Sequence, residues 1–265
     1  MAEEMSFWDH LEELRWCLLR VVVAFVIALV GCFIVLPSIF DSVILGPSHA
    51  DFFLYRWLGF VYGEAQDVDI ININVTSQFM THISVSMWMA LLLIFPYLMY
   101  QIWVFVRPAL YSREVHGVRS AFLGGTGLFY LGCAVGYLIV FPIIFKFLTG
   151  YRVSALVENQ INLNSYMSLL LSMVFVMGLV FELPSLAWVL GKLGVVSREL
   201  LRSWRRYAIV VLLVLAALIT PTGDPFTLMV VFLPLYGLYE LSVLVVPRGG
   251  DPEVIDGQKD AFQNN

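Results

Sequence analysis

Long and almost uncharged apolar runs recur along this sequence, and they restrict its fold more than any other feature. In chain order they are Leu18–Ile39, Ser77–Val106, Ser120–Leu148, Tyr166–Leu190, Tyr207–Thr220 and Phe226–Val246. A helix needs roughly 20 apolar residues to cross about 30 Å of hydrocarbon, and the first four runs reach that length. The chain is 60% hydrophobic and only 13% charged, with a mean hydropathy of +0.85. We therefore expect an all-α integral membrane protein with six transmembrane helices.

The last two runs are expected to form a hairpin. Tyr207–Thr220 has about 14 residues and would extend over only about 21 Å as a helix. It is joined to Phe226–Val246 by the sequence Pro221-Thr-Gly-Asp-Pro225, which predicts a tight turn. We expect two short helices that thin the bilayer around them. A single re-entrant hairpin is the alternative.

Lysine and arginine residues are distributed unequally between the two sides of the predicted membrane. Three of them, Arg56, Lys146 and Arg152, fall on one side, and the other twelve fall on the side of the two termini. Because positive residues accumulate in cytoplasmic loops, we expect both termini in the cytoplasm. Residues 1–246 then form one membrane domain that includes an amphipathic segment at 6–16. Residues 41–76 are expected to form short caps outside, and residues 247–265 a polar, disordered tail.

Composition also argues against several classes of function. A net charge of −5 and a pI of about 5.3 do not fit a nucleic-acid-binding surface. The cysteines are read as small hydrophobic residues; they are Cys17, Cys32 and Cys133. The histidines are scattered, which argues against a metal site; they are His10, His49, His82 and His116. We expect no metal ion and no cofactor.

An acidic segment precedes the first apolar run. Residues 1–16 contain five acidic side chains and one basic side chain, Arg15. Acidic residues in the first turn of a helix are favoured by the helix dipole, and this explains part of the pattern. It does not explain Glu13, which lies further along. An acidic patch in the cytoplasm suggests a basic partner.

A second acidic residue, Glu114, emerges in the same compartment. It follows the segment Tyr100-Gln-Ile-Trp-Val-Phe-Val-Arg-Pro-Ala-Leu-Tyr-Ser-Arg, in which Pro108 marks the exit from the second run. A charged loop residue is commonly just solvated, so composition alone does not single out Glu114.

Three further acidic residues lie in or beside the later runs. Glu182 lies inside Tyr166–Leu190, and a carboxyl group within a membrane helix is costly and usually functional or paired. The structural alternative is a protonated Glu182 bonded to a backbone carbonyl beside the kink at Pro184. Asp224 is expected to cap the last helix. Glu240, near the end of the last run, is expected to serve packing or the membrane interface.

Four motifs occur together and in order in this chain. They are His10-Leu-Glu-Glu-Leu-Arg15, the segment Tyr100–Glu114, Phe181-Glu-Leu-Pro184 and Thr220-Pro-Thr-Gly-Asp224. Between about Ser6 and Val246 the chain resembles TatC, the signal-recognising core subunit of the twin-arginine protein translocase. The first two motifs are specific as a pair, whereas the last two are weak alone.

The resemblance implies a function, partners and a location. A protein of this family would bind the twin-arginine signal peptides of folded cargo and nucleate an export complex driven by the proton-motive force. It would have no enzymatic activity, and it would lie in the inner membrane. Its helices would form a concave, cupped wall. Its partners would be single-span TatA- and TatB-type subunits, further TatC copies and the lipid bilayer.

The resemblance also implies site residues. Those expected to bind the signal peptide are His10, Glu13, Leu14, Arg15, Phe105, Pro108, Leu110, Tyr111 and Glu114. Those expected to make contacts within the membrane are Gln101, Glu182 and Pro184. A functional role for Asp224, in the outside turn, stays open.

Other functions fit the sequence less well. An ion-coupled transporter could use Glu182 to carry a proton, but it would need several polar residues near the midplane and matched internal repeats, and neither is found in the sequence. An intramembrane enzyme is also disfavoured, because the sequence contains no GxSxG or HExxH motif. A purely structural scaffold would require the four motifs to be coincidental.

Overall fold

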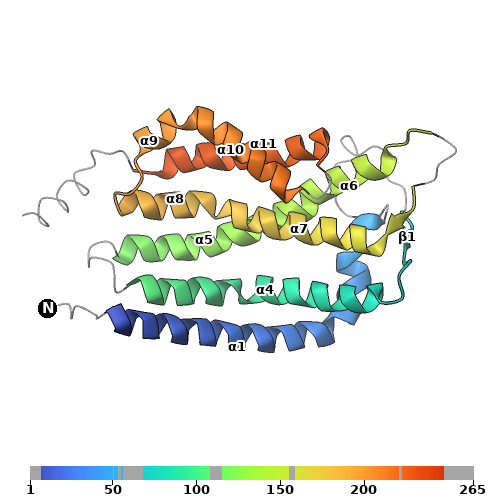
Figure 1. Cartoon of the computed structure of the whole chain (residues 1–265), viewed down its shortest axis with the longest axis horizontal. Coiled ribbons are helices and arrows are strands. Elements are labelled where there is room, and N and C mark those ends of the chain that lie inside the picture. The colour runs from blue at the N-terminus through green and yellow to red at the C-terminus, as the bar shows by residue number, and fades with distance from the viewer. Residues whose placement is uncertain are drawn as a thin grey trace, which may run out of the picture. The chain divides into compact units, whose positions relative to one another are not determined.

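Helices make up nearly all the regular structure in the computed structural model of the chain (Figure 1). The structure describes residues 7–49, 51–52, 55, 68–107, 115–154, 159–220 and 223–247, with the backbone alone at 7–10 and 115–120. Within these ranges, 5 helical stretches are long and apolar enough to cross a membrane: Leu11–Ser48, Ser77–Val106, Ala121–Gly150, Leu163–Lys192 and Pro225–Val245. The predicted all-α membrane fold class is confirmed.

The first half of the chain contains two long helices and short connecting elements. They are α1 (Phe7–Ile39), the π-helical turn η1 (Phe40–Ile44), the 3-10 turn η2 (Gly46–Ser48), β1 (Ile70–Ile71) and α4 (Ser77–Val106). The predicted caps at residues 41–76 are only partly described, since residues 50, 53–54 and 56–67 lie outside the described residues, and their location outside the membrane stays a prediction. The pairing of β1 with a later strand, β2, was not predicted.

The second half consists mainly of helices interrupted by turns. They are α5 (Val115–Val135), the π-helical turn η4 (Gly136–Val140), α6 (Phe141–Gly150), β2 (Ile161–Asn162), α7 (Leu163–Phe181), α8 (Leu183–Lys192), α9 (Arg198–Ser203), α10 (Arg205–Ile219) and α11 (Pro225–Val245). β1 and β2 pair in parallel, with Ile70 opposite Ile161.

The last two helices differ in length, which corrects the prediction that both are short. α10 has 15 residues and extends over about 22 Å at 1.5 Å per residue, so it is shorter than a standard span. α11 has 21 residues and is long enough to cross. Pro234 lies inside α11 without ending it, because an interior proline kinks a membrane helix more often than it stops it.

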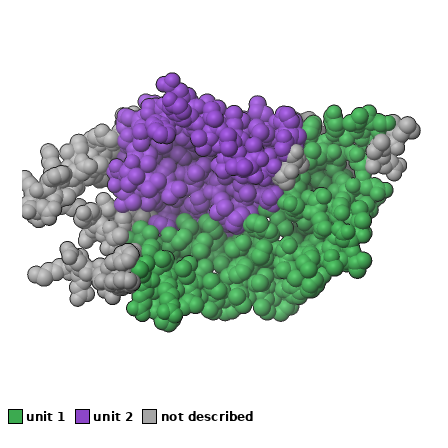
Figure 2. All heavy atoms as spheres, viewed as in Figure 1, with its two compact units in different colours: residues 1–110, 141–171 green, residues 111–140, 172–265 purple. Residues whose placement is uncertain are grey.

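The chain groups into two compact units (Figure 2). Unit 1 comprises residues 1–110 and 141–171, and unit 2 comprises residues 111–140 and 172–265. Two of the three divisions fall inside the helical stretches Ala121–Gly150 and Leu163–Lys192. Each unit is therefore built from two separate parts of the sequence.

In unit 1, α1 and α4 lie side by side and antiparallel (Figure 1), and a histidine joins them. Pro37 lies inside α1 and has no N–H to offer the Phe33 carbonyl four residues earlier. His82 Nε2 of α4 lies 2.8 Å from that carbonyl oxygen. The His82 and Phe33 rings stack with centroids 3.9 Å apart. Since a carbonyl only accepts, His82 is the donor, and it satisfies the backbone group that Pro37 leaves open.

An aromatic cluster anchors the end of α1 in the same unit. Tyr166 is fully buried, and its hydroxyl donates to the carbonyl oxygen of Ile44 at 2.8 Å. Phe141 and Phe145 pack edge-on against the Tyr166 ring, with centroids 5.3 and 5.1 Å away. The carbonyl at the end of η1 is thereby satisfied inside an apolar core, where an open acceptor would be costly.

Unit 2 depends on close approach between α5 and the part of α7 that belongs to it. A Cβ atom on Gly132 would lie 2.5 Å from the carbonyl oxygen of Met177, and one on Gly178 would lie 2.5 Å from Cys133 Sγ. Small residues let membrane helices come together in this way. Cys133 is a buried free thiol, and all three cysteines are free, in agreement with their prediction as small hydrophobic residues.

The hydrogen bond between His82 and Phe33 can be tested by a double-mutant cycle. His82→Phe keeps a stacked ring but removes the donor, and it should cost about 1 kcal/mol of stability, as is typical of hydrogen bonds between membrane helices. In a Pro37→Ala background, residue 37 regains its N–H and can satisfy the carbonyl itself, so His82→Phe should cost less. Unfolding of the four purified proteins in detergent measures the difference. An equal cost in both backgrounds would contradict this interpretation.

The glycine contact in unit 2 predicts position-specific destabilisation. Gly132→Ala should destabilise the protein by about 1–3 kcal/mol, because the added methyl group overpacks the helix contact. Gly127→Ala, in the same helix, is the matched control because a Cβ there meets nothing within 4 Å. The midpoint of thermal unfolding should fall for the first variant alone. Equal midpoints for the two variants would refute the assignment.

Candidate functional site

Glu13 of α1 has an unsatisfied carboxylate oxygen. Its Oε2 is shielded from solvent and has no hydrogen-bond partner among the described residues. One turn later, Cys17 Sγ donates to the carbonyl oxygen of Gln101 in α4 at 3.6 Å. Because α1 and α4 are antiparallel, the turn of α1 that carries Glu13 lies level with the turn of α4 that carries Phe105. The geometry therefore offers an open acceptor on α1 at the level of Phe105 in α4.

The neighbouring face of α1 is apolar. Leu11, Leu18 and Arg15 are exposed, and Leu14 is half-buried. A shallow groove runs along this face, lined by Leu11, Leu14, Arg15, Leu18, Leu19 and Val22. An apolar segment could lie in this groove while a basic group reaches Glu13.

The other predicted residues of this site are only partly described. Gln101 of α4, which was predicted to make contacts within the membrane and not with the signal peptide, is buried inside unit 1. His10 is described by its backbone alone, whereas Pro108, Leu110, Tyr111 and Glu114 lie outside the described residues. The pairing of Glu13 with Glu114 stays a prediction.

A second candidate site surrounds Glu182, at a break between two helices. α7 ends at Phe181 and α8 begins at Leu183, with Pro184 in its first turn. The Glu182 N–H donates to the Leu179 carbonyl at 3.1 Å and its own carbonyl accepts from Leu186 N–H at 2.9 Å. The helix thus breaks at Glu182 while the main-chain groups of this residue remain bonded.

The Glu182 carboxyl group occupies space that Gly125 of α5 leaves open. A Cβ atom on Gly125 would lie 2.6 Å from Glu182 Oε2 and 2.9 Å from Ser185 Oγ. Ser185 Oγ donates to the Ala121 carbonyl at 3.0 Å, whereas Glu182 Oε1 is shielded and has no partner among the described residues. The alternative bond from Glu182 to a backbone carbonyl is therefore not formed by Oε1.

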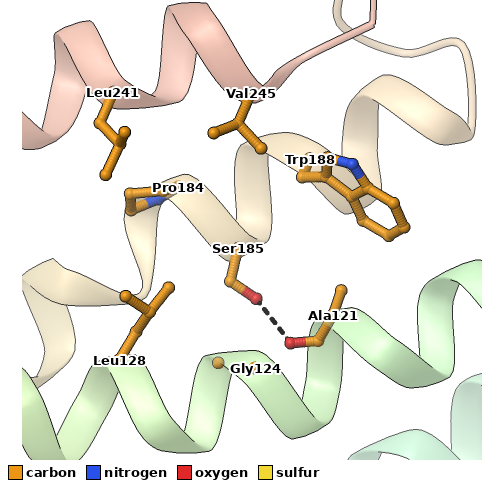
Figure 3. A pocket seen from close by; sticks show the side chains of 9 residues that line it. Ala121, Gly124, Leu128, Pro184, Ser185, Trp188, Leu241 and Val245 are labelled. Carbon is orange, nitrogen blue, oxygen red and sulfur yellow. Dashed lines mark hydrogen bonds between the residues drawn. The ribbon is translucent and has the colours of Figure 1, made fainter.

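An apolar pocket of about 240 Å³ is shown in Figure 3. One of its lining residues is Gly125, the glycine next to the Glu182 carboxyl group. The pocket lies between α5, α8 and α11, and its lining residues are Ala121, Gly124, Gly125, Leu128, Pro184, Ser185, Trp188, Leu241 and Val245. Ser185 and Trp188 supply the polar side-chain atoms of this lining. The cavity could receive apolar side chains of another membrane helix, with the Glu182 carboxyl group available to a polar residue.

Asp224 and Glu240, the other two acidic residues singled out in or beside the later apolar runs, have structural partners. Asp224 caps α11 by accepting from the Thr227 N–H at 2.8 Å, which confirms the predicted cap. Glu240 Oε2 lies 2.6 Å from the Arg205 guanidinium, and Tyr236 donates to its Oε1 at 3.1 Å. Sequence analysis missed the Arg205 partner, and it also missed Gly125. The adjacent glycines 124 and 125 in an apolar run are a signal that could have indicated a close helix contact.

Comparison with known families and structures gives consistent results. The family model for "Sec-independent protein translocase protein (TatC)" matches residues 9–234. The chain is 34% identical over 253 residues to the Sec-independent protein translocase protein TatC of Blattabacterium sp. subsp. Periplaneta americana, covering 91% of this chain and 95% of the relative. It is 32% identical to the protein of the same name from Deinococcus radiodurans, covering 90% and 84%.

Solved structures agree with the sequence relatives. A crystal structure described as the twin arginine translocase receptor TatC in DDM matches with a TM-score of 0.75 and 31% identity, covering 90% of this chain and 99% of that chain. A second crystal structure of the twin arginine translocase receptor TatC matches with a TM-score of 0.72 and 32% identity, covering 89% and 97%.

The fit of Glu182 against Gly125 predicts a specific coupling. Gly125→Ala should destabilise the protein by less than about 1 kcal/mol. The added methyl group would displace the Glu182 carboxyl group and the Ser185 hydroxyl, and both are side-chain ends that can move. Gly124→Ala is the control, since a Cβ there meets nothing within 4 Å. In a Glu182→Ala background the cost of Gly125→Ala should shrink, because the larger collision is removed. Thermal unfolding in detergent measures the stability of each variant. An equal effect of Gly125→Ala in the wild-type and Glu182→Ala backgrounds would contradict the contact.

Proposed function

Because this chain belongs to the TatC family of Sec-independent protein translocase proteins, we propose that it binds the twin-arginine signal peptides of folded cargo proteins and nucleates their export complex. Its role is protein transport and not catalysis. In this proposal Glu13 and Glu114 are joint acceptors for the arginine pair.

The unsatisfied Glu13 oxygen is the observation that carries this proposal. A shielded carboxylate oxygen without a partner is costly unless a donor arrives. A guanidinium group can donate two parallel, charge-assisted hydrogen bonds to a carboxylate, whereas an ammonium group cannot. Glu13 Oε2 has no hydrogen-bond partner among the described residues, so it can accept from an incoming arginine.

The groove on α1 supports a second part of the same contact. Signal peptides carry an apolar region after their basic residues. In our proposal Leu14 and the neighbouring leucines of the groove receive apolar residues, while Arg15 and His10 flank the acidic acceptor. Phe105, Pro108, Leu110 and Tyr111 would complete the binding surface next to Glu114.

We assign recruitment within the membrane to the Glu182 site. An apolar cavity beside a carboxyl group without a hydrogen-bond partner among the described residues suits a single-span helix that carries one polar group, as expected for TatA- and TatB-type subunits. Glu182 and Pro184 would form this contact. The contact within the membrane expected of Gln101 stays a separate prediction. The proposed complex also includes further copies of this chain and is driven by the proton-motive force.

The proposed location is the inner membrane with both termini in the cytoplasm. The unequal distribution of lysine and arginine supports this orientation. An ion-coupled transporter that uses Glu182 is less well supported. The lining of the adjoining cavity is apolar apart from Ser185 and Trp188, whereas a proton site usually gathers several polar groups.

Titration of signal peptides tests the proposal. A twin-arginine peptide and its twin-lysine version are added to the detergent-purified full chain. Glu13→Ala and Glu114→Ala should each weaken binding of the twin-arginine peptide tens- to hundreds-fold, because loss of one desolvated carboxylate–guanidinium pair costs about 2–3 kcal/mol. The double variant should lose less than the sum if both acids hold one peptide segment.

The lysine peptide provides the control. It should bind weakly to the wild type, and neither substitution should change its affinity much. Glu12→Ala is a matched variant, because Glu12 is an exposed neighbour in the same helix and should leave the arginine peptide unaffected. Equal affinity of the wild type for both peptides would refute guanidinium recognition by this chain.

A further inference from the structure

An arginine- and aromatic-rich surface covers α9 and the first turn of α10 in unit 2. We call it the arginine surface, and its members are Arg198, Arg202, Trp204, Arg206 and Tyr207. Trp204 and Tyr207 are 58% and 57% exposed, and their rings lie 5.8 Å apart. The Arg206 guanidinium carbon lies 5.7 Å from the centre of the Tyr207 ring. None of these residues belongs to the sites described above.

This surface is held firmly on α11. Ser197 caps α9 by accepting from the Leu200 N–H at 3.1 Å. The Tyr239 hydroxyl of α11 donates to the Leu201 carbonyl at 2.5 Å. The first turn of α10 is tied down by the ion pair between Arg205 and Glu240. The exposed side chains therefore project from a positioned scaffold, which reduces the entropy lost when a ligand binds.

The charges of this surface are not balanced within the described protein. Arg205 is neutralised by Glu240, whereas Arg202 and Arg206 have no carboxylate partner among the described residues and are exposed. Arg198 Nε is shielded from solvent and has no hydrogen-bond partner among those residues. Glu199 is the single acidic residue between Arg198 and Arg206. A net positive charge therefore remains for an external anion.

The position of the surface indicates which anion fits. Exposed tryptophan and tyrosine side chains are typical of the headgroup level of a membrane, and the apolar helix α10 starts directly at Arg205. α10 has only 15 residues, so the bilayer must thin around it or adjust in another way. Arginine side chains at its first turn could hold headgroup phosphates at the depth that this short helix requires.

We propose that the arginine surface binds the headgroup of an anionic phospholipid. Arg202 and Arg206 would donate to its phosphate oxygens, with the planar geometry that suits phosphate, and Trp204 and Tyr207 would pack against the glycerol and upper acyl region. The site is independent of the proposed binding of signal peptides, which uses residues of α1 and the segment before α5.

Native mass spectrometry of the detergent-purified full chain tests this inference. The protein is titrated with phosphatidylglycerol and, separately, with phosphatidylcholine. The wild type should bind phosphatidylglycerol more tightly. Arg202→Gln/Arg206→Gln should weaken that binding roughly thirtyfold, because each arginine near an anionic lipid surface contributes about a factor of five. Both side chains are exposed, so the variant should fold, and its unfolding midpoint verifies this.

A matched control distinguishes the loss of a specific lipid site from the effect of a lower overall positive charge. Arg20→Gln/Arg152→Gln removes the same charge from two exposed positions elsewhere, and it should leave phosphatidylglycerol binding unchanged. Equal weakening by this control, or equal binding of phosphatidylcholine by the wild type, would overturn the inference. Displacement of the lipid by millimolar inorganic phosphate would also overturn it, since the site would then bind a free anion. Signal-peptide titration of the Arg202→Gln/Arg206→Gln variant should be unchanged, which keeps the two proposals separable.

Discussion

Inside hydrocarbon a backbone carbonyl or amide must find a partner within the protein, because an open one costs several kcal/mol. The irregular points of this chain show how that demand is met. Pro37 has no N–H to donate to the carbonyl of Phe33, and His82 of the next long helix donates to it instead. The carbonyl of Ile44, at the end of η1, receives the Tyr166 hydroxyl. At both points a side chain from another helix satisfies the open carbonyl, and these two hydrogen bonds join helices of unit 1.

In unit 2 the helices must be held together mainly by close packing, because lipid tails are as apolar as the side chains and give no hydrophobic driving force between helices. Glycines let α5 approach α7 until backbone and side-chain atoms touch. The same device creates the membrane site, because the missing side chain of Gly125 leaves room for the Glu182 carboxyl group. The carboxyl group is therefore accommodated sterically while its Oε1 lacks a hydrogen bond. This combination of tight fit and unsatisfied acceptor distinguishes Glu182 from Glu240, which has both Arg205 and Tyr236.

Much of the fold could be predicted from local sequence. The apolar runs predicted the long helices, and Asp224 before a proline predicted the cap of α11. Long-range partners were harder to foresee. Three such pairs join residues that lie between 35 and 57 positions apart: His82–Phe33, Arg205–Glu240 and Glu182–Gly125. The composition around one residue of a pair does not indicate which distant residue it will meet. Among the residues predicted to bind the signal peptide, Glu13 was singled out as an acid that helix capping does not explain, and its role stays a prediction. Its missing hydrogen bond could not be foreseen from the sequence.

The sequence by itself determined the class of protein and the positions of its long apolar helical stretches, because the hydrophobicity of a run and its length decide whether it can leave water. It also indicated the family, because four family motifs occur together and in the same order in this chain. Only the tertiary structure decided which polar groups are satisfied and which remain open. That outcome depends on the register between helices, since a shift of one turn moves a side chain by about 5.4 Å, which is enough to break any hydrogen bond. Glu240 meets Arg205 across α10 and α11, whereas Glu13 Oε2 and Glu182 Oε1 meet no donor among the described residues.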